Sequence, residues 1–128
     1  MRPTRSPGLA PYLVVQDATG LMEFIDKGLG GSVGFVTAGA GGRPIHHAEM
    51  LLGGGVVMLA DAPEGRGAFP AMVHLYVPDA EGAHDRAVRA GAQSVRRPTL
   101  QDDGDRRGGV RDAWGNEWWF TQSPKSKD

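Results

Sequence analysis

An internal duplication constrains the fold of this chain more than any other feature of its sequence. With a shift of 62 residues, the segment from Tyr12 to Val33 aligns without a gap on the segment from His74 to Val95. Each copy runs from an apolar stretch through an aspartate to a helix-like pattern, a glycine-rich turn and a second apolar stretch. A repeat of this kind predicts two copies of one supersecondary unit that share a core.

A second and weaker stretch of the repeat aligns at a shift of 60. It places the segment from His46 to Ala60 on the segment from Arg106 to Phe120. The change from 62 to 60 falls in the loop region before this stretch, where insertions are tolerated. At this shift, Leu59 is the counterpart of Trp119.

Both copies predict the order strand, helix, strand, strand, strand. Asp17 and Asp79 suit helix N-caps, because a carboxylate accepts hydrogen bonds from the free N–H groups of the first turn. The helices follow at Ala18 to Gly28 and Ala80 to Ala90, with apolar residues at helical spacing in the first. Strands are expected near residues 12–15, 32–37, 45–52, 56–60, 72–77, 93–95, 107–111 and 117–122.

We therefore expect an α+β fold, in which two tandem βαβββ modules form a cupped, mostly antiparallel sheet with the helices on its outer face. Residues 1–128 are expected to form one domain, with modules at 9–62 and 70–122 and a frayed tail at 123–128. A chain of this length buries roughly two thirds of the surface of its unfolded form, so it needs no disulfide or structural metal to fold.

Composition excludes several classes of protein. The chain has no cysteine, which rules out disulfides, thiolate metal sites and a cysteine nucleophile. Its formal net charge is -1, so no broad basic surface favours nucleic acid or an anionic membrane. The first apolar run, Leu13 to Val15, is too short for a signal peptide or a membrane span. We expect a cytoplasmic protein that binds neither nucleic acid nor membrane.

Short motifs follow one another in a recognisable order along the chain. They are Pro11-Tyr12-Leu13, His47-Ala48-Glu49-Met50, Met58-Leu59-Ala60-Asp61, Gly104-Asp105-Arg106, Val110-Arg111-Asp112 and Trp114-Gly115-Asn116. In this order they resemble the PhnB-like branch of the vicinal oxygen chelate superfamily, the group of glyoxalases, bleomycin-resistance proteins and extradiol dioxygenases. The resemblance implies two βαβββ modules in a cupped sheet, a pocket inside the cup and a homodimer.

The resemblance also implies where a metal ion would bind, because metal enzymes of this superfamily place ligands on the first and fourth strand of each module. The corresponding positions hold Ala10, Leu59, Met72 and Trp119. Divalent ions such as zinc or calcium prefer imidazole nitrogen or carboxylate oxygen, and methionine alone makes no site. The sequence therefore predicts no metal and no cofactor, unless a register slip of two residues brings Glu117 or His74 into these positions.

Alternation along the strands predicts which side chains line the cup, because residues two apart in a strand share a face. With the four former ligand positions facing the cup, Trp118 and Phe120 face the helices instead. The candidate ligand-binding residues are Tyr12, His47, Glu49, Leu59, Met72, His74, Tyr76, Trp114, Glu117 and Trp119. Among them, Trp114 and Trp119 suit stacking on a flat ligand.

Several alternatives remain open within this set. His74 and Glu117 suit a catalytic acid–base pair, because a carboxylate beside an imidazole tunes its titration, although a structural hydrogen-bonded pair fits equally well. His47 and Glu49 share one face of a strand and, with His74, suit a shifted metal site. His84 falls in the polar pattern of the second helix and is expected to be solvated.

Together these observations favour a metal-free protein that binds a small planar or amphipathic molecule in the cup between its modules. The alternative is a metal-dependent or acid–base lyase, isomerase or dioxygenase of the same superfamily. The sequence does not decide whether the chain is an enzyme. It also leaves the ligand unidentified, because the loops near residues 39–44 and 61–70 shape the pocket.

Overall fold

The computed structural model describes residues 8–39, 44–63 and 67–124, and these residues form two βαβββ modules, as the duplication predicts. The first module contains β1 (Tyr12–Val15), α1 (Ala18–Leu29), β2 (Ser32–Ala38), β3 (Ile45–Leu52) and β4 (Gly55–Asp61). The second contains β5 (Met72–Tyr76), α2 (Ala80–Arg89), β6 (Gln93–Leu100), β7 (Arg106–Arg111) and β8 (Glu117–Gln122). Residues 40–43 and 64–66 of the two loops expected to shape the pocket, and residues 125–128 of the predicted tail, lie outside the described residues.

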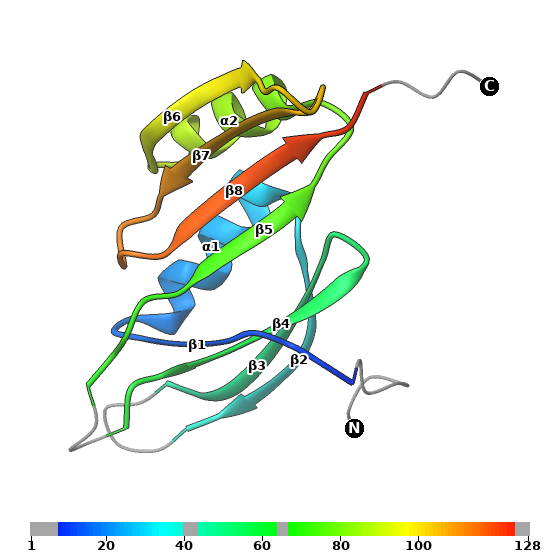
Figure 1. Ribbon diagram of the computed structural model, residues 1–128. Coiled ribbons are helices and arrows are strands. Elements are labelled where there is room, and N and C mark those ends of the chain that lie inside the picture. The colour runs from blue at the N-terminus through cyan, green and yellow to red at the C-terminus, as the bar shows by residue number, and fades with distance from the viewer. Residues whose placement is uncertain (1–7, 40–43, 64–66, 125–128) are drawn as a thin grey trace.

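Each module builds its own four-stranded sheet. The strand orders are β1-β4-β3-β2 and β5-β8-β7-β6, so the two copies have the same topology. The first and last strands of each module pair in parallel, and the other neighbours are antiparallel. Figure 1 shows the two sheets without closure into a barrel. The predicted α+β architecture is confirmed, with two sheets in place of one.

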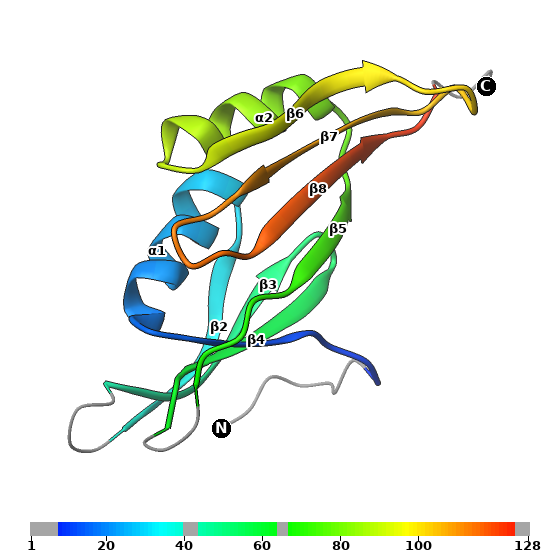
Figure 2. The ribbon, with the colours of Figure 1, turned by 60° about the vertical axis from the view of Figure 1, so that its left-hand side comes forward.

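Both helices lie on the same side of the molecule, where they cover one face of each sheet and contact each other (Figure 2). They approach closely, because a Cβ atom at Gly28 would lie 3.0 Å from the Cβ atom of Ala90. Arg86 of α2 also donates from Nε to the carbonyl oxygen of Lys27 at 2.8 Å. No helix of the described segments covers the opposite faces of the two sheets, and we call these the open faces. Within the described residues, no helix is long and apolar enough to cross a membrane.

Apolar side chains between the helices and the sheets form the core. Trp118 and Phe120 are buried there, on the face that alternation predicts. The core also contains Leu13, Val15, Leu21, Phe24, Ile25, Met50, Leu59 and Val110. The apolar stripe of α1 and the inner faces of the strands thus pack as the sequence pattern indicates.

Two side chains accept hydrogen bonds from the first-turn N–H groups of each helix. The predicted caps are present, because Asp17 and Asp79 each accept from a first-turn glycine N–H at 3.1 Å. The second cap comes from the end of the last strand of the module. Asp61 Oδ1 accepts from Ala18 N at 2.7 Å, and Gln122 Oε1 accepts from Ala80 N at 2.9 Å. The last strand therefore fixes the helix start in both copies.

Strand β6 is longer than predicted, since it continues to Leu100 rather than ending at Val95. Pro98 has no N–H to donate, which argues against a strand at that position. However, β6 is an edge strand, and its register with β7 shifts between Arg96 and Thr99. Proline is tolerated at such an irregular edge, so the strand passes through it.

His84 is buried rather than solvated, and the prediction of a solvated side chain is wrong. The residue is 2 % exposed, on the inward stripe of α2 with Ala80 and Ala87. Its Nε2 atom lies 2.7 Å from Ser94 Oγ, and its Nδ1 atom lies 3.0 Å from Asp85 Oδ1. These two hydrogen bonds satisfy both ring nitrogens and so offset the cost of removing the imidazole from water.

Candidate functional site

Strand register decides which side chains reach the open face of the first sheet. Tyr12 of β1 pairs with Met58 of β4, and Met58 pairs with Glu49 of β3. The next row of the sheet contains Leu59 and faces the helices. Leu59 is 0 % exposed, so the prediction that it lines the cup is wrong. Met58 occupies the open-face position instead.

Leu59 was placed on the wrong face because a single repeat shift of 60 was applied to both strands of a hairpin. The length of this hairpin differs between the two modules. Leu51 pairs with Val56 in the first hairpin, whereas Arg111 pairs with Glu117 in the second. The shift is therefore 60 between β3 and β7 (51 to 111) but 61 between β4 and β8 (56 to 117). A slip of one residue exchanges the two faces of a strand.

The strand register corrects the positions at which the resemblance implies metal ligands. On the paired strands they hold Met58, Met72 and Trp119, and Ala10 lies two residues before β1. Two thioethers, a methyl group and an indole do not fit zinc, iron or manganese, which require imidazole or carboxylate ligands. Among the described residues, no three His, Asp or Glu side chains gather as a metal site would require. The alternative site of His47, Glu49 and His74 is therefore not assembled.

Three predicted binding residues form a hydrogen-bonded chain on the open face of the first sheet. The Tyr12 hydroxyl oxygen lies 3.0 Å from His47 Nδ1, and His47 Nε2 lies 2.9 Å from Glu49 Oε2. The imidazole also contacts the rings of Tyr12 and Phe35, at centroid distances of 5.5 and 6.4 Å. Glu49 is 3 % exposed and Tyr12 is 42 % exposed, so the chain runs from the interior to the surface.

Trp119 forms a fixed platform on the open face of the second sheet. Its indole ring lies against Gly109 of the neighbouring strand, where a Cβ atom would come within 2.5 Å of indole Cδ2. The indole Nε1 donates to Glu117 Oε1 at 3.0 Å. The guanidinium carbon of Arg96 lies 5.9 Å from the ring centroid. The Gly109 backbone, the Glu117 carboxylate and the Arg96 guanidinium therefore hold the indole in one orientation. An aromatic surface held in this way suits stacking.

Glu117 anchors this platform. Its Oε2 atom accepts from Arg111 Nη2 at 2.7 Å, while Oε1 accepts from the indole of Trp119. The hydrogen bond from the Trp119 indole holds the pKa of Glu117 below its ordinary value, and the hydrogen bond from the Arg111 guanidinium lowers this pKa further. Glu117 is therefore ionised at neutral pH with both oxygens engaged, which does not suit a general acid.

His74 is held by neighbouring strands rather than by Glu117. Its Nε2 atom is hydrogen-bonded to Thr121 Oγ1, and Arg107 Nε donates to the same hydroxyl oxygen at 3.1 Å. The His74 and Tyr76 rings also contact each other, with centroids 5.2 Å apart. The predicted acid–base pair of His74 and Glu117 is thus not assembled, although both residues lie on the open face.

Met72 and Tyr76 flank His74 on β5 and are among the most exposed large apolar side chains of the described chain. Met72 is 69 % exposed and Tyr76 is 73 % exposed. Both alternate with Val73 and Leu75, which pack against the core. The structure therefore places the predicted residues Met72, His74, Tyr76, Glu117 and Trp119 on one open face.

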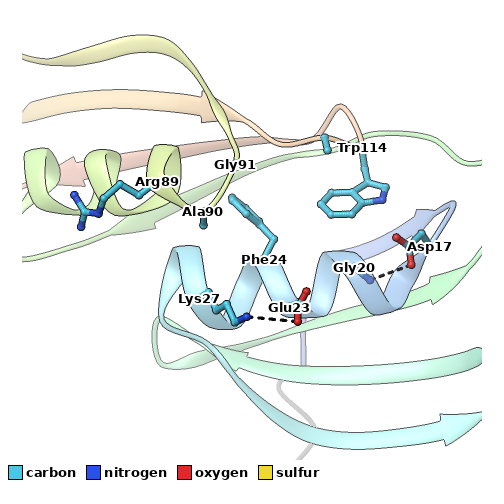
Figure 3. Close-up of a pocket in the computed structure, with 10 residues that line it drawn as sticks. Asp17, Gly20, Glu23, Phe24, Lys27, Arg89, Ala90, Gly91 and Trp114 are labelled. Carbon is cyan, nitrogen blue, oxygen red and sulfur yellow. Dashed lines mark hydrogen bonds and ion pairs between the residues drawn. The ribbon is translucent and has the colours of Figure 1, made fainter.

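Trp114 lies on the helix side of the molecule and does not join Trp119. It lines a cleft of about 530 Å³ with residues of α1 that include Phe24 and Gly20 (Figure 3). A Cβ atom at Gly20 would lie 2.9 Å from ring atom Cζ2 of Trp114, so helix and ring are in close contact. The two tryptophans face opposite sides of the second sheet, and one flat ligand does not stack on both.

Sequence reasoning missed the residues that support the platform. Gly109 is the counterpart of Glu49 at the shift of 60, so the repeat itself carried a signal that this position faces the open side. Arg96 gave no such signal, because it lies between two register shifts of β6. Arg107 and Arg111 alternate with Gly109 along β7, and both are paired with carboxylates: Arg107 with Asp103 and Asp105, and Arg111 with Glu117.

The duplicated modules, their shared strand order and the helix-free faces define a protein of the glyoxalase type. A family model described as the Glyoxalase/Bleomycin resistance protein/Dioxygenase superfamily matches residues 8–120, and the chain belongs to this superfamily. Among sequence relatives, the uncharacterized protein Mb0911c of Mycobacterium bovis is 34 % identical over 127 residues, which cover 91 % of this chain and 83 % of that protein.

Solved structures show the same fold. The crystal structure of TioX from Micromonospora sp. ML1 superposes with a TM-score of 0.76 at 26 % identity, covering 89 % of this chain and 96 % of TioX. A glyoxalase-related enzyme from Fulvimarina pelagi superposes with a TM-score of 0.73 at 18 % identity, covering 98 % of this chain and 95 % of that one. The second likeness concerns the fold alone.

Proposed function

We propose that this protein binds a small planar or amphipathic molecule on the open faces of its sheets, without a metal ion and as a homodimer. The observation that carries the proposal is the Trp119 platform. A ring pinned against Gly109 and hydrogen-bonded to Glu117 keeps its orientation before a ligand arrives. Little side-chain entropy is then lost on binding, which raises affinity for a flat partner.

The surroundings of the platform favour a ligand that combines a flat ring with a negative charge. The Arg96 guanidinium carbon lies 5.9 Å from the indole centroid and supplies a cation there, whereas Arg107 and Arg111 are already paired with carboxylates. Exposed Met72 and Tyr76 add apolar area on β5. Aromatic stacking alone contributes about 0.5–1.5 kcal/mol, so charge and apolar contact must supply the rest. We therefore propose an aromatic acid or a similar planar anion as the ligand class.

A binding experiment on tryptophan fluorescence tests this proposal. A panel of planar acids and amphipathic natural products is titrated into the wild type and into Trp119→Phe. We expect saturable quenching that is lost in Trp119→Phe and kept in Trp114→Phe, which removes a partly exposed tryptophan on the helix side. Trp118 is buried and serves as a constant background. Equal responses of the two variants, or no response across the panel, would count against the proposal.

Metal independence needs a separate measurement. Protein purified without chelator is analysed for zinc, nickel, manganese and iron. Because Met58 and Met72 offer only thioether sulfur, we expect less than one metal ion per ten chains, about the level of contamination. A stoichiometric ion would instead favour the alternative, a metal-dependent lyase, isomerase or dioxygenase of the superfamily.

The remaining parts of the proposal rest on the sequence. The motif order favours the PhnB-like branch within the superfamily, and the absence of cysteine from the sequence fits the reducing cytoplasm. A homodimer follows from the resemblance, and the exposed apolar side chains of the open face support it.

A further inference from the structure

The chain Glu49–His47–Tyr12 in the first sheet has chemistry that ligand binding does not require. In the tautomer that carries its proton on Nε2, His47 donates to Glu49 Oε2. The other ring nitrogen, Nδ1, is then an acceptor and receives the hydroxyl proton of Tyr12. The phenol of Tyr12 is therefore hydrogen-bonded to a base, and that base is oriented by a buried acid.

The sheet builds this arrangement from three strands. Tyr12, Met58 and Glu49 form one row across β1, β4 and β3, and His47 lies two residues before Glu49 on the same face. Ala60 follows Met58 on that face of β4, the strand that the phenol crosses to reach His47. The geometry thus depends on long-range pairing, which holds all three groups in register.

Exposure falls steadily along the chain, from the phenol inward. Tyr12 is 42 % exposed, the His47 side chain is 17 % exposed and the Glu49 side chain is 4 % exposed. A buried carboxylate, a mostly buried imidazole and a hydroxyl on a partly exposed side chain are the parts that activated hydroxyl groups share in unrelated enzymes.

We propose that Tyr12, His47 and Glu49 form an acid–base site that exchanges a proton with a small molecule bearing a phenol or a comparably acidic hydroxyl. The hydroxyl proton of the small molecule moves to Tyr12 Oη, and the original phenolic proton of Tyr12 moves to His47 Nδ1. The products are the ligand anion, a neutral Tyr12 and an imidazolium paired with the Glu49 carboxylate. The reverse transfers restore the site, and no other reactant is needed.

Chemical labelling tests this inference without knowledge of the ligand. An aryl sulfonyl fluoride reacts with an activated phenol: Oη bonds to sulfur, fluoride leaves, and the phenolic proton passes to the base. The sequence has two tyrosines, so Tyr76 is an internal control. In a single chain Tyr76 is 73 % exposed, more than Tyr12, so exposure alone predicts faster labelling of Tyr76 when the reaction is run with the Met72→Glu variant, which is expected to be monomeric. Activation predicts faster labelling of Tyr12, by about tenfold or more.

Variants separate activation from simple accessibility. His47→Gln keeps a hydrogen-bonding side chain beside Tyr12 but removes the base, so we expect Tyr12 labelling to fall by about tenfold or more, with Tyr76 labelling unchanged. Glu49→Gln removes the charge and should reduce labelling in the same direction. Thermal unfolding confirms that each variant is folded, and His47→Gln, at the less buried of the two positions, remains informative if Glu49→Gln does not fold.

Two outcomes would overturn the inference. One is faster labelling of Tyr76 than of Tyr12 in the Met72→Glu variant, and the other is an unchanged Tyr12 rate in folded His47→Gln. The inference is independent of the proposed ligand platform, because Trp119 and Tyr12 belong to different sheets. Failure of ligand binding at Trp119 and failure of labelling at Tyr12 are therefore distinguishable.

Discussion

Glu49 and Gly109 are counterparts in the two modules, and the difference between them decides what each open face can do. Glu49 fills its position with a carboxylate that orients His47. Gly109 leaves its position empty, and the Trp119 indole occupies the space. Because a glycine has no Cβ, the ring lies directly on the backbone. One duplicated scaffold thus supports a proton-transfer chain in one sheet and an aromatic platform in the other.

Gly109→Ala should displace the platform. The new Cβ atom would lie 2.5 Å from indole Cδ2, and a ring held by Glu117 must shift to avoid it. We expect ligand affinity to fall by roughly three- to tenfold, the loss of one aromatic contact. Acrylamide quenching in a Trp114→Phe background should rise as the ring leaves its place. Gly67→Ala is the control, because a Cβ atom there would meet nothing within 4 Å.

The platform should also respond to acid, through Glu117. Its pKa lies below the ordinary value, so the ionised form is stabilised by folding. This stabilisation is fully present above the ordinary glutamate pKa, about 4.3, and is lost as the pH falls through the lowered folded value. We expect Trp119 fluorescence to be constant from neutral pH to about pH 4.3 and to change below it. Glu117→Gln should abolish this transition, and a transition retained in that variant would contradict the assignment.

At the scale of elements, the second helix caps give the last strand of each module a role that hydrophobic packing alone does not explain. Asp61 closes the first module by accepting from the N–H groups of Ala18 and Ile45, at 2.7 and 2.8 Å. In the second module, Gln122 accepts from the N–H group of Ala80, the counterpart of Ala18. Asp61 and Gln122 are related by the shift of 61, the same shift that relates β4 and β8. Helix start and sheet register are therefore coupled within each module.

Asp61→Ala should destabilise the protein much more than loss of an ordinary cap. It leaves two backbone N–H groups without their carboxylate partner, at a cost of about 3 kcal/mol of unfolding free energy. Asp79→Ala removes a more exposed cap in extended backbone and should cost about 1 kcal/mol. Urea unfolding measures both values. Equal losses in the two variants would show that the buried cap adds nothing.

The elements themselves were predictable from the sequence, because their signals are local. The helix caps Asp17 and Asp79, the period of α1 and the alternation around Trp118 all act within a few residues. The chain order βαβββ followed from the repeat. The length of β6 was not predictable, because only its edge position allows Pro98 inside the strand.

The site was predictable only in part, because side-chain facing depends on distant pairing. Tyr12, His47, Glu49 and Trp119 were placed on the correct faces by alternation. Leu59 was not, since one extra residue between β7 and β8 changes the shift between modules. The contact between Tyr12 and His47 crosses a whole strand, and a single sequence carries no record of such a contact.

At the scale of the whole molecule, the modules meet chiefly through α1 and α2, and the open faces of both sheets are left uncovered by helices (Figure 2). Exposed Met72 and Tyr76 lie on the second of these faces. Clustered apolar side chains of this kind usually mark an interaction site. A two-fold partner brings the same patch from both copies into one interface. The proposed homodimer is therefore expected to use the edge strand β5 of this face, beside the strand that carries the Trp119 platform.

Met72→Glu tests this arrangement directly. In a two-fold interface the substitution introduces one buried carboxylate from each copy, so both the lost apolar contact and the desolvated charges oppose association. We expect the wild type to sediment as a dimer and Met72→Glu to sediment as a monomer at the same concentration. Val88→Glu is the matched control, because Val88 is exposed on α2, away from the open face. Dissociation by Val88→Glu instead, or a dimeric Met72→Glu, would place the interface elsewhere. A monomeric wild type would remove the dimer from the proposal and leave each open face to bind its ligand within one chain.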